Sequence, residues 1–235
     1  AAMGETLVGT TVDSRVVLAF KVADAAVQPA LPDGWVPFTF PKGPVAGANL
    51  VVAMMDRHSM VPAEGDPDPA MTGPTVAVMA YARKDGVEGI RGFVTRVYEV
   101  PPVVDPYGTS VAADIERVAG YADAGGGMRK QTETWTVRPE AGGELSLDLD
   151  FDVGRFNWST GNESRPYSAV NPDFHRIYRY DQLVALAMSD GLGLELRGSV
   201  DFTATGGDMA ALFDGSEELL TIMAIPTFVR EISLP

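Results

Sequence analysis

The stretch VEGIRGFVTRVYEV, residues 87–100, followed directly by Pro101 and Pro102, decides how the chain is organised. Residues 90–100 are rich in β-branched and aromatic side chains, a composition that predicts a strand. The two prolines end that strand, because proline has no amide proton to donate to a central ladder. Residues 90–100 therefore form a buried strand with a fixed end, and the neighbouring elements are arranged around it.

A second periodic pattern follows after a short loop. In SVAADIERVAGY, Val111, Ile115 and Val118 recur at i, i+4 and i+7, the spacing of one helix face. Gly120 stands where a helix would stop. The pattern predicts a helix over residues 110–120, and a strand that feeds a short helix is one way to place a reactive group at a pocket mouth.

The rest of the chain reads as short strands joined by turns rich in glycine and proline. We predict a mainly β (α+β) fold with about ten strands and two or three short helices, the sheet mostly antiparallel and either closed into a barrel or folded as a sandwich. Residues 48–55 are apolar throughout and should be buried on both faces. The sequence further predicts a turn-rich insertion at 157–171, a strand or helix at 183–188, separate strands at 218–225 and 228–234, and a mobile loop at 62–74.

Composition excludes several classes of function. The 235 residues, 1–235, form a single domain with no internal repeat, and there is no cysteine, which removes disulfides, thiolate zinc sites and cysteine nucleophiles. A net charge of −14 argues against nucleic acid and anionic membranes as partners. No apolar run approaches the roughly 20 residues of a membrane span. We expect a cytoplasmic homo-oligomer, with Ala1 and Ala2 ahead of Met3 being a tag remnant or a processed terminus.

Motifs for metal or nucleotide chemistry are weak or missing. Asp148, Asp150 and Asp152 share one strand face and could hold calcium, but a solvated face explains them better. The two histidines, His58 and His175, are far apart and form no metal-binding pair. No nucleophile elbow, dinucleotide fingerprint or phosphate loop occurs. We predict neither a cofactor nor a metal, and we retain His175 as a candidate ligand-binding residue because it lies in the aromatic run FHRIYRY.

Two arginines stand inside apolar strands, Arg15 in SRVVLAF and Arg96 in GFVTRVYEV. A buried guanidinium needs a partner, which is either a protein carboxylate or the carboxylate of a ligand. Glu99 and Glu116 are available as protein partners. Six aromatic residues could line a pocket or belong to the core: Tyr98, Tyr121, Trp135, Phe156, Trp158 and Tyr178. Of these, Tyr121 and Trp158 are our ligand-binding candidates, and Trp135 is assigned to the core.

These patterns, taken in order, resemble the acetoacetate decarboxylase-like superfamily over most of the chain. The matching segments are SRVVLAFKVAD and LPDGW near the N-terminus, ANLVVAMMD, PPVVDPYG after the 90–100 strand, and EELLTIMAIPTFVREI near the C-terminus. The resemblance implies a closed, cone-shaped antiparallel β barrel around an inner pocket. It also implies that Arg15 matches an arginine in that pocket. Decarboxylases of the family use a lysine for Schiff-base chemistry, activated by a neighbouring lysine.

The chain departs from this pattern where the chemistry would occur. Ile115, Glu116 and Arg117 stand where the lysine pair is expected, and the four lysines lie elsewhere: Lys21, Lys42, Lys84 and Lys130. Arginine does not replace a Schiff-base lysine because it stays protonated. We therefore expect a pocket for a small carboxylic or keto acid, or a fatty-acid- or polyketide-like ligand. The protein is then an enzyme of altered lyase, hydratase or aldol type with Glu116 as general acid or base, or else a non-catalytic binding or carrier protein.

Overall fold

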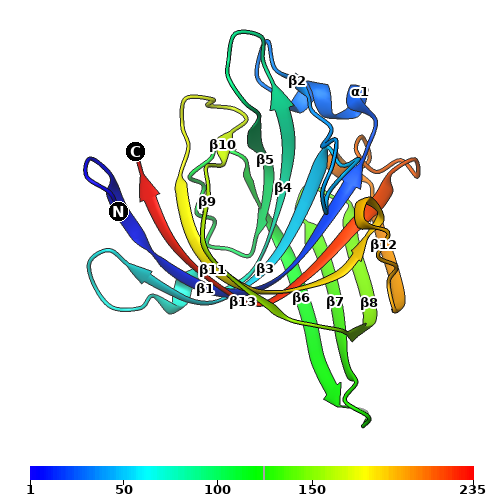
Figure 1. The fold of residues 1–235 in the computed structure, drawn as a ribbon. Coiled ribbons are helices and arrows are strands. Elements are labelled where there is room, and N and C mark those ends of the chain that lie inside the picture. Colours follow the sequence, from blue (N-terminus) through cyan, green and yellow to red (C-terminus); the bar gives the residue numbers. More distant parts are fainter. Residues whose placement is uncertain (124) are drawn as a thin grey trace.

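A single curled sheet makes up most of the structure (Figure 1). The computed structural model describes residues 1–123 and 125–235. The strands are paired in the order β12-β8-β7-β6-β5-β4-β3-β1-β13-β11-β9. Their bounds are β1 Thr6–Lys21, β3 Leu50–Pro62, β4 Gly73–Arg83, β5 Arg91–Glu99, β6 Ser110–Asp123, β7 Arg129–Pro139, β8 Glu144–Val153, β9 Asn157–Ser164, β11 Ile177–Ser189, β12 Gly198–Thr205 and β13 Glu218–Leu234.

Several short elements lie outside this strand order. They are α1 Asp24–Val27, β2 Val36–Pro37, β10 Tyr167–Ser168 and the 3₁₀ turns η1 Gln28–Ala30, η2 Pro69–Met71, η3 Asp190–Leu192 and η4 Gly207–Met209. In the described part of the chain, no helix is both long enough and apolar enough to cross a membrane. The prediction of a mainly β chain with few short helices is confirmed.

The observed sheet is less regular than the closed barrel that we expected. Most neighbouring strands are antiparallel, but β5 pairs in parallel with both β6 and β10, so the sheet is mixed. Among the described residues, the ladder of paired strands runs from β12 to β9 and does not close on itself. The closed barrel is therefore not confirmed, whereas the strong curl of the sheet is plain in Figure 1.

The helix predicted over residues 110–120 is wrong, because that segment is strand β6, paired with β7 from Ala113 to Asp123. The helical spacing of Val111, Ile115 and Val118 was coincidental. Ala113 and Ile115, two residues apart, are buried, whereas Val118 is 70% exposed. The burial therefore follows the alternation of a strand, and pairing with β7 outweighs the local helical pattern.

Two further segments differ from prediction, and for a third the structure decides between two predicted alternatives. Residues 157–171 contain β9, an edge strand with mostly exposed side chains, which hides the alternation that usually marks a strand. Residues 183–188, for which strand and helix were both open, are strand and form the C-terminal half of β11. Residues 218–225 and 228–234 belong to one continuous strand, β13, which runs through Pro226.

The central strands are fully buried on one face and partly buried on the other, so the burial on both faces predicted for residues 48–55 is only partly confirmed, with Val51 and Ala53 half-buried. One face packs into the main core with β7 and β8; its members include Val16, Leu18, Leu50, Val52, Met54, Val76, Val78, Trp135, Leu145 and Leu147. The opposite face of the same strands carries Arg15, Val17, Val51, Ala53, Ala77 and Met79. This second face bounds an internal cavity, and the alternation of the strands decides which side chains reach it.

Candidate functional site

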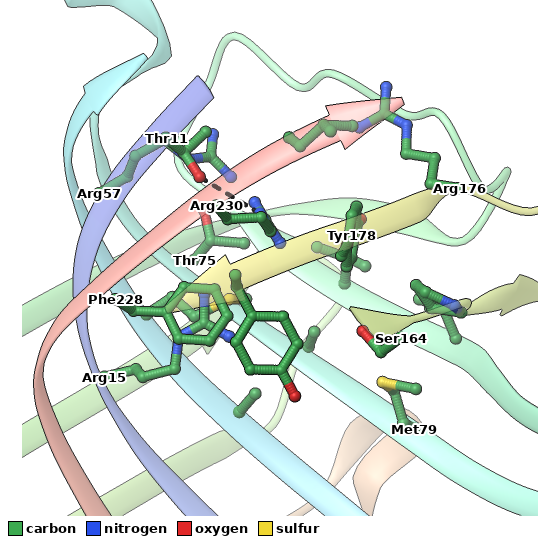
Figure 2. Close-up of a pocket in the computed structure, with 18 of the residues that line it drawn as sticks. Thr11, Arg15, Arg57, Thr75, Met79, Ser164, Arg176, Tyr178, Phe228 and Arg230 are labelled. Atoms are coloured by element: carbon green, nitrogen blue, oxygen red, sulfur yellow. Dashed lines mark hydrogen bonds between the residues drawn. The ribbon is translucent and has the colours of Figure 1, made fainter. Parts of the chain in front are cut away.

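A cavity of about 350 Å³ lies on the inner face of the curled sheet. Its walls come from β1, β3, β4, β5, β11 and β13, together with the loop that joins β5 to β6. Apolar side chains form much of the wall, among them Val17, Val51, Ala53, Ala77, Met79 and Val94. A small number of charged and hydroxyl groups project among them, which is the usual make-up of a small-molecule site (Figure 2).

Arg15 lines this cavity and is paired with a protein carboxylate. Its Nε and Nη2 atoms each donate to a carboxylate oxygen of Asp13 at 2.7 Å. The Asp13 side chain is 1% exposed and that of Arg15 is 10% exposed. The guanidinium also lies 3.5 Å from the ring centroid of Phe228. Burial lowers the pKa of Arg15 and the adjacent Asp13 opposes that shift, so the guanidinium stays charged.

Arg230 and Arg57 lie together at one side of the cavity, as Figure 2 shows. Arg230 Nε donates to Thr11 Oγ1 at 3.2 Å, and its guanidinium lies 4.2 Å from the ring centroid of Tyr178. Arg57 donates to the carbonyl of Met71 at 3.2 Å. Burial lowers the pKa of Arg57, and repulsion from Arg230 lowers it further. Across residues 1–123 and 125–235, neither guanidinium has a carboxylate within 4.0 Å.

Glu99 is the carboxylate that lines the cavity, at the end of β5. Its Oε2 accepts a hydrogen bond from the Val104 amide at 2.9 Å. This bond ties the loop that joins β5 to β6, called the covering loop, to the end of β5. Burial raises the pKa of Glu99, while this hydrogen bond and the positive charge of Arg57 oppose the shift. Arg176, another cavity arginine, has a buried Nε for which the described residues supply no hydrogen-bond acceptor.

A pair of tyrosine hydroxyls completes the polar lining. The Tyr107 and Tyr178 oxygens are 2.6 Å apart, and Ser168 Oγ donates to the Tyr107 carbonyl, which holds the covering loop in place. Burial raises the pKa of Tyr107. Burial also opposes ionisation of Tyr178, but Arg230 and Arg176 outweigh it and lower the pKa of Tyr178. Tyr178 is therefore the more acidic hydroxyl of the pair.

Of the predicted site residues, Arg15 lies in the cavity and two charged ones do not. Arg15 is paired, but its partner is Asp13 rather than Glu99 or Glu116. Arg96 forms an ion pair of 2.6 Å with Asp208 and is not part of the cavity lining. Glu116 is exposed on β6, outside the cavity. Its assignment as general acid or base depended on a helix that is absent from residues 110–120.

The three predicted aromatic candidates also lie outside the lining. Tyr121 is 52% exposed and Trp158 is 55% exposed. His175 stacks on Tyr167, with 4.5 Å between ring centroids, and burial lowers its pKa. The expectation that these residues contact a ligand has no support from this geometry.

Sequence reasoning missed five residues that matter here: Asp13, Arg57, Tyr107, Arg176 and Arg230. For the arginines a signal was available. Each lies in or beside a strand, at a position whose side chain points to the same face as the other cavity residues. Arg57 is two residues after Met55, and Arg230 is two residues after Phe228. Tyr107 lies in a loop, where no periodic pattern indicates direction.

The lysines lie away from the cavity in the part of the chain that is described. None of the four appears among the lining residues. Lys21 pairs with Asp24 and Lys130 with Asp150. Among the described residues no cluster of carboxylates and histidines is arranged to hold a metal ion.

This curled sheet with a cavity on its inner face has the fold of the acetoacetate decarboxylase-like proteins. An acetoacetate decarboxylase-like enzyme from Sphingomonas wittichii RW1 superposes with a TM-score of 0.59 at 10% identity, covering 99% of this chain and 92% of that one. The enduracididine biosynthesis enzyme MppR, in complex with pyruvate, gives 0.53 at 15% identity, covering 100% and 90%. Acetoacetate decarboxylase itself gives 0.51 at 8% identity, covering 97% and 87%.

The likeness is one of structure. No protein-family model matches the chain, and no curated protein matches it by sequence. The resemblance noted from the sequence is therefore confirmed for the fold, while activity has to be argued from the cavity.

Proposed function

We propose that this protein is an enzyme that binds a small organic acid in the cavity and transfers protons to and from it without a Schiff base. The observation that carries the proposal is Glu99, a half-buried carboxylate of raised pKa, facing a cavity with four arginines, Arg15, Arg57, Arg176 and Arg230. A carboxylate whose pKa is raised toward the working pH is suited to general acid–base catalysis. The reaction class is lyase or hydratase.

Each polar group has a place in such a reaction. The cavity arginines Arg57, Arg176 and Arg230, which have no carboxylate within 4.0 Å in the described part of the chain, bind the acid group of the substrate and stabilise negative charge that develops on it. Glu99 removes a proton from the carbon next to the carbonyl, and the C–H electron pair forms the new double bond. The C–O bond to the leaving hydroxyl breaks, and Tyr178, the more acidic tyrosine, protonates that hydroxyl to give water. The reverse sequence hydrates the double bond.

The ligand class draws on both the cavity and the neighbours. MppR is named in complex with pyruvate and, in a second structure of TM-score 0.56, with the condensation product of pyruvate and imidazole 4-carboxaldehyde. A keto acid therefore fits this fold, and the arginines of the present chain supply the partners for its carboxylate. The apolar wall leaves room for a short hydrocarbon tail.

Glu99→Gln is the test. Turnover of a panel of 2-oxo, 3-hydroxy and α,β-unsaturated acids should fall by about 10²- to 10⁴-fold, the usual loss of a general acid or base. Binding should persist, because glutamine retains the shape of the side chain. Glu195→Gln, at an exposed glutamate outside the cavity lining, is the matched control.

The variant Glu116→Gln should retain activity. This result would distinguish catalysis by Glu99 from the general acid or base role that we first expected for Glu116. Unchanged turnover in Glu99→Gln would refute the catalytic role of Glu99. Binding of acids by the wild type with no turnover at all would favour the alternative, a carrier, for which the apolar wall is the supporting observation.

A further inference from the structure

The charges around the cavity do not balance. Among residues 1–123 and 125–235, four arginines line it, and Glu99 is the one lining carboxylate. Asp13 belongs to the same group because it neutralises Arg15. Four positive charges thus face two negative ones, which leaves an excess of two positive charges on the inner wall.

Nearby acidic groups do not cancel this excess. Asp105, in the covering loop, is exposed and accepts a hydrogen bond from the Ser110 amide. Glu5, Glu163 and Glu231 lie around Arg179, whose side chain points to the opposite face of β11 from Tyr178. Arg179 therefore has its own carboxylates, whereas Arg57, Arg176 and Arg230 have none within 4.0 Å among the described residues.

An excess of positive charge on a buried wall is costly without a counter-ion. Arg230 is 6% exposed, and the cation next to it, Arg57, is destabilised by burial and by Arg230. Buried charges of this kind require partners, and a guanidinium takes its strongest ones from carboxylates. The charge of the missing partner has to match the excess.

We propose that the natural ligand of this cavity is a small organic dianion, such as a dicarboxylic acid. Glu99 offsets one of the three charges of Arg57, Arg176 and Arg230, and the two charges of the ligand neutralise the other two. The proposal rests on the proposed function, since it specifies the substrate class of the same site. The cavity, at about 350 Å³, is near the lower end of the roughly 300–1,000 Å³ found for ligand pockets, which restricts the dianion to a short chain.

A matched pair of acids tests the charge without changing chain length. 2-Oxoglutarate and 2-oxopentanoate both have five carbons and a 2-oxo acid group, and they differ in the terminal carboxylate. Affinity is measured by calorimetry at pH 7.5 and constant ionic strength, because screening weakens charge pairs. The wild type should bind the dianion about tenfold or more tightly, the effect of one additional charge-assisted contact.

Arg57→Gln and Arg176→Gln should each reduce this preference to below about threefold, since each removes one of the excess charges. Arg179→Gln, which removes an arginine from the outer face of β11, should leave the preference unchanged. Two variants are used so that misfolding of one does not decide the test.

The outcomes separate the two proposals. Equal affinity for both acids in the wild type, or a preference that survives in both Arg57→Gln and Arg176→Gln, would overturn the dianion proposal and leave acid binding intact. Binding of neither acid, nor of any acid in the wider panel, would overturn the proposed function itself.

Discussion

Replacing Arg15 by methionine should destabilise the protein strongly, because it leaves the Asp13 carboxylate buried without a partner. Asp13 is 1% exposed and receives both of its Arg15 hydrogen bonds at 2.7 Å. Methionine is long enough to keep part of the packing against Phe228 but offers no donor. The loss is therefore electrostatic, and it falls on Asp13.

The size of the effect follows from the burial of the pair. Breaking a buried ion pair by removing one member costs about 3–5 kcal/mol. For a chain of this length a urea m-value of about 3 kcal/mol/M is reasonable, so the unfolding midpoint should fall by about 1 to 1.7 M. A weak surface pair would instead cost about 1 kcal/mol or less.

Equilibrium urea unfolding, followed by tryptophan fluorescence, measures this shift. The double variant Asp13→Asn/Arg15→Met should lose less stability than the two single variants added together, because the stranded charge is gone in the double variant. A midpoint that moves by less than about 0.3 M in Arg15→Met, which corresponds to about 1 kcal/mol, would refute the reasoning. Additive losses across the cycle would refute it as well.

Three further outcomes are expected. Acetoacetate followed by borohydride should leave the intact mass unchanged, since none of the lysines lines the cavity among the described residues; an adduct would contradict this. Arg179, through its hydrogen bond, lowers the pKa of Glu5 to about 2 from 4.5, so that pair stabilises the fold above pH 4.5 and ceases to do so as the pH falls toward 2. Melting curves of wild type and Glu5→Gln should accordingly converge near pH 2, and a gap that is the same at every pH would argue against the pair. Limited proteolysis should cut first within residues 62–74, where the chain is largely exposed, and an early cut within residues 90–100 would count against the fold.

Much of the fold could be predicted from the sequence because alternation is a strong signal where one face is buried. Residues 144–153 show this, with Leu145, Leu147 and Leu149 in the core. The signal failed where pairing partners, rather than local pattern, decide the structure. In β6 a helical spacing competed with alternation, and in β9 the exposed edge removed the pattern altogether.

The cavity was harder to predict, because its members come from strands that are distant in sequence. Arg15, which we expected in the pocket because it interrupts an apolar strand, is among the residues that line the cavity. Its partner Asp13 was missed although residues two apart on a strand share a face. Arg57, Arg176 and Arg230 meet only when β3, β11 and β13 are placed around β1, an arrangement that no local pattern contains.

The pairing of β1 with β13 also governs when the cavity can form during synthesis. In the backbone register of β1 and β13, Arg15 lies opposite Ile225. The two strands therefore join segments that are synthesised far apart in time. Neighbours such as β6, β7 and β8 can pair as soon as they leave the ribosome, whereas contacts of such long range form slowly and late. Until β13 is in place, the guanidinium groups of the inner wall remain hydrated, and the cost of burying them is deferred to the final step of folding. An acid present at that step would act as a ligand that promotes completion of the fold.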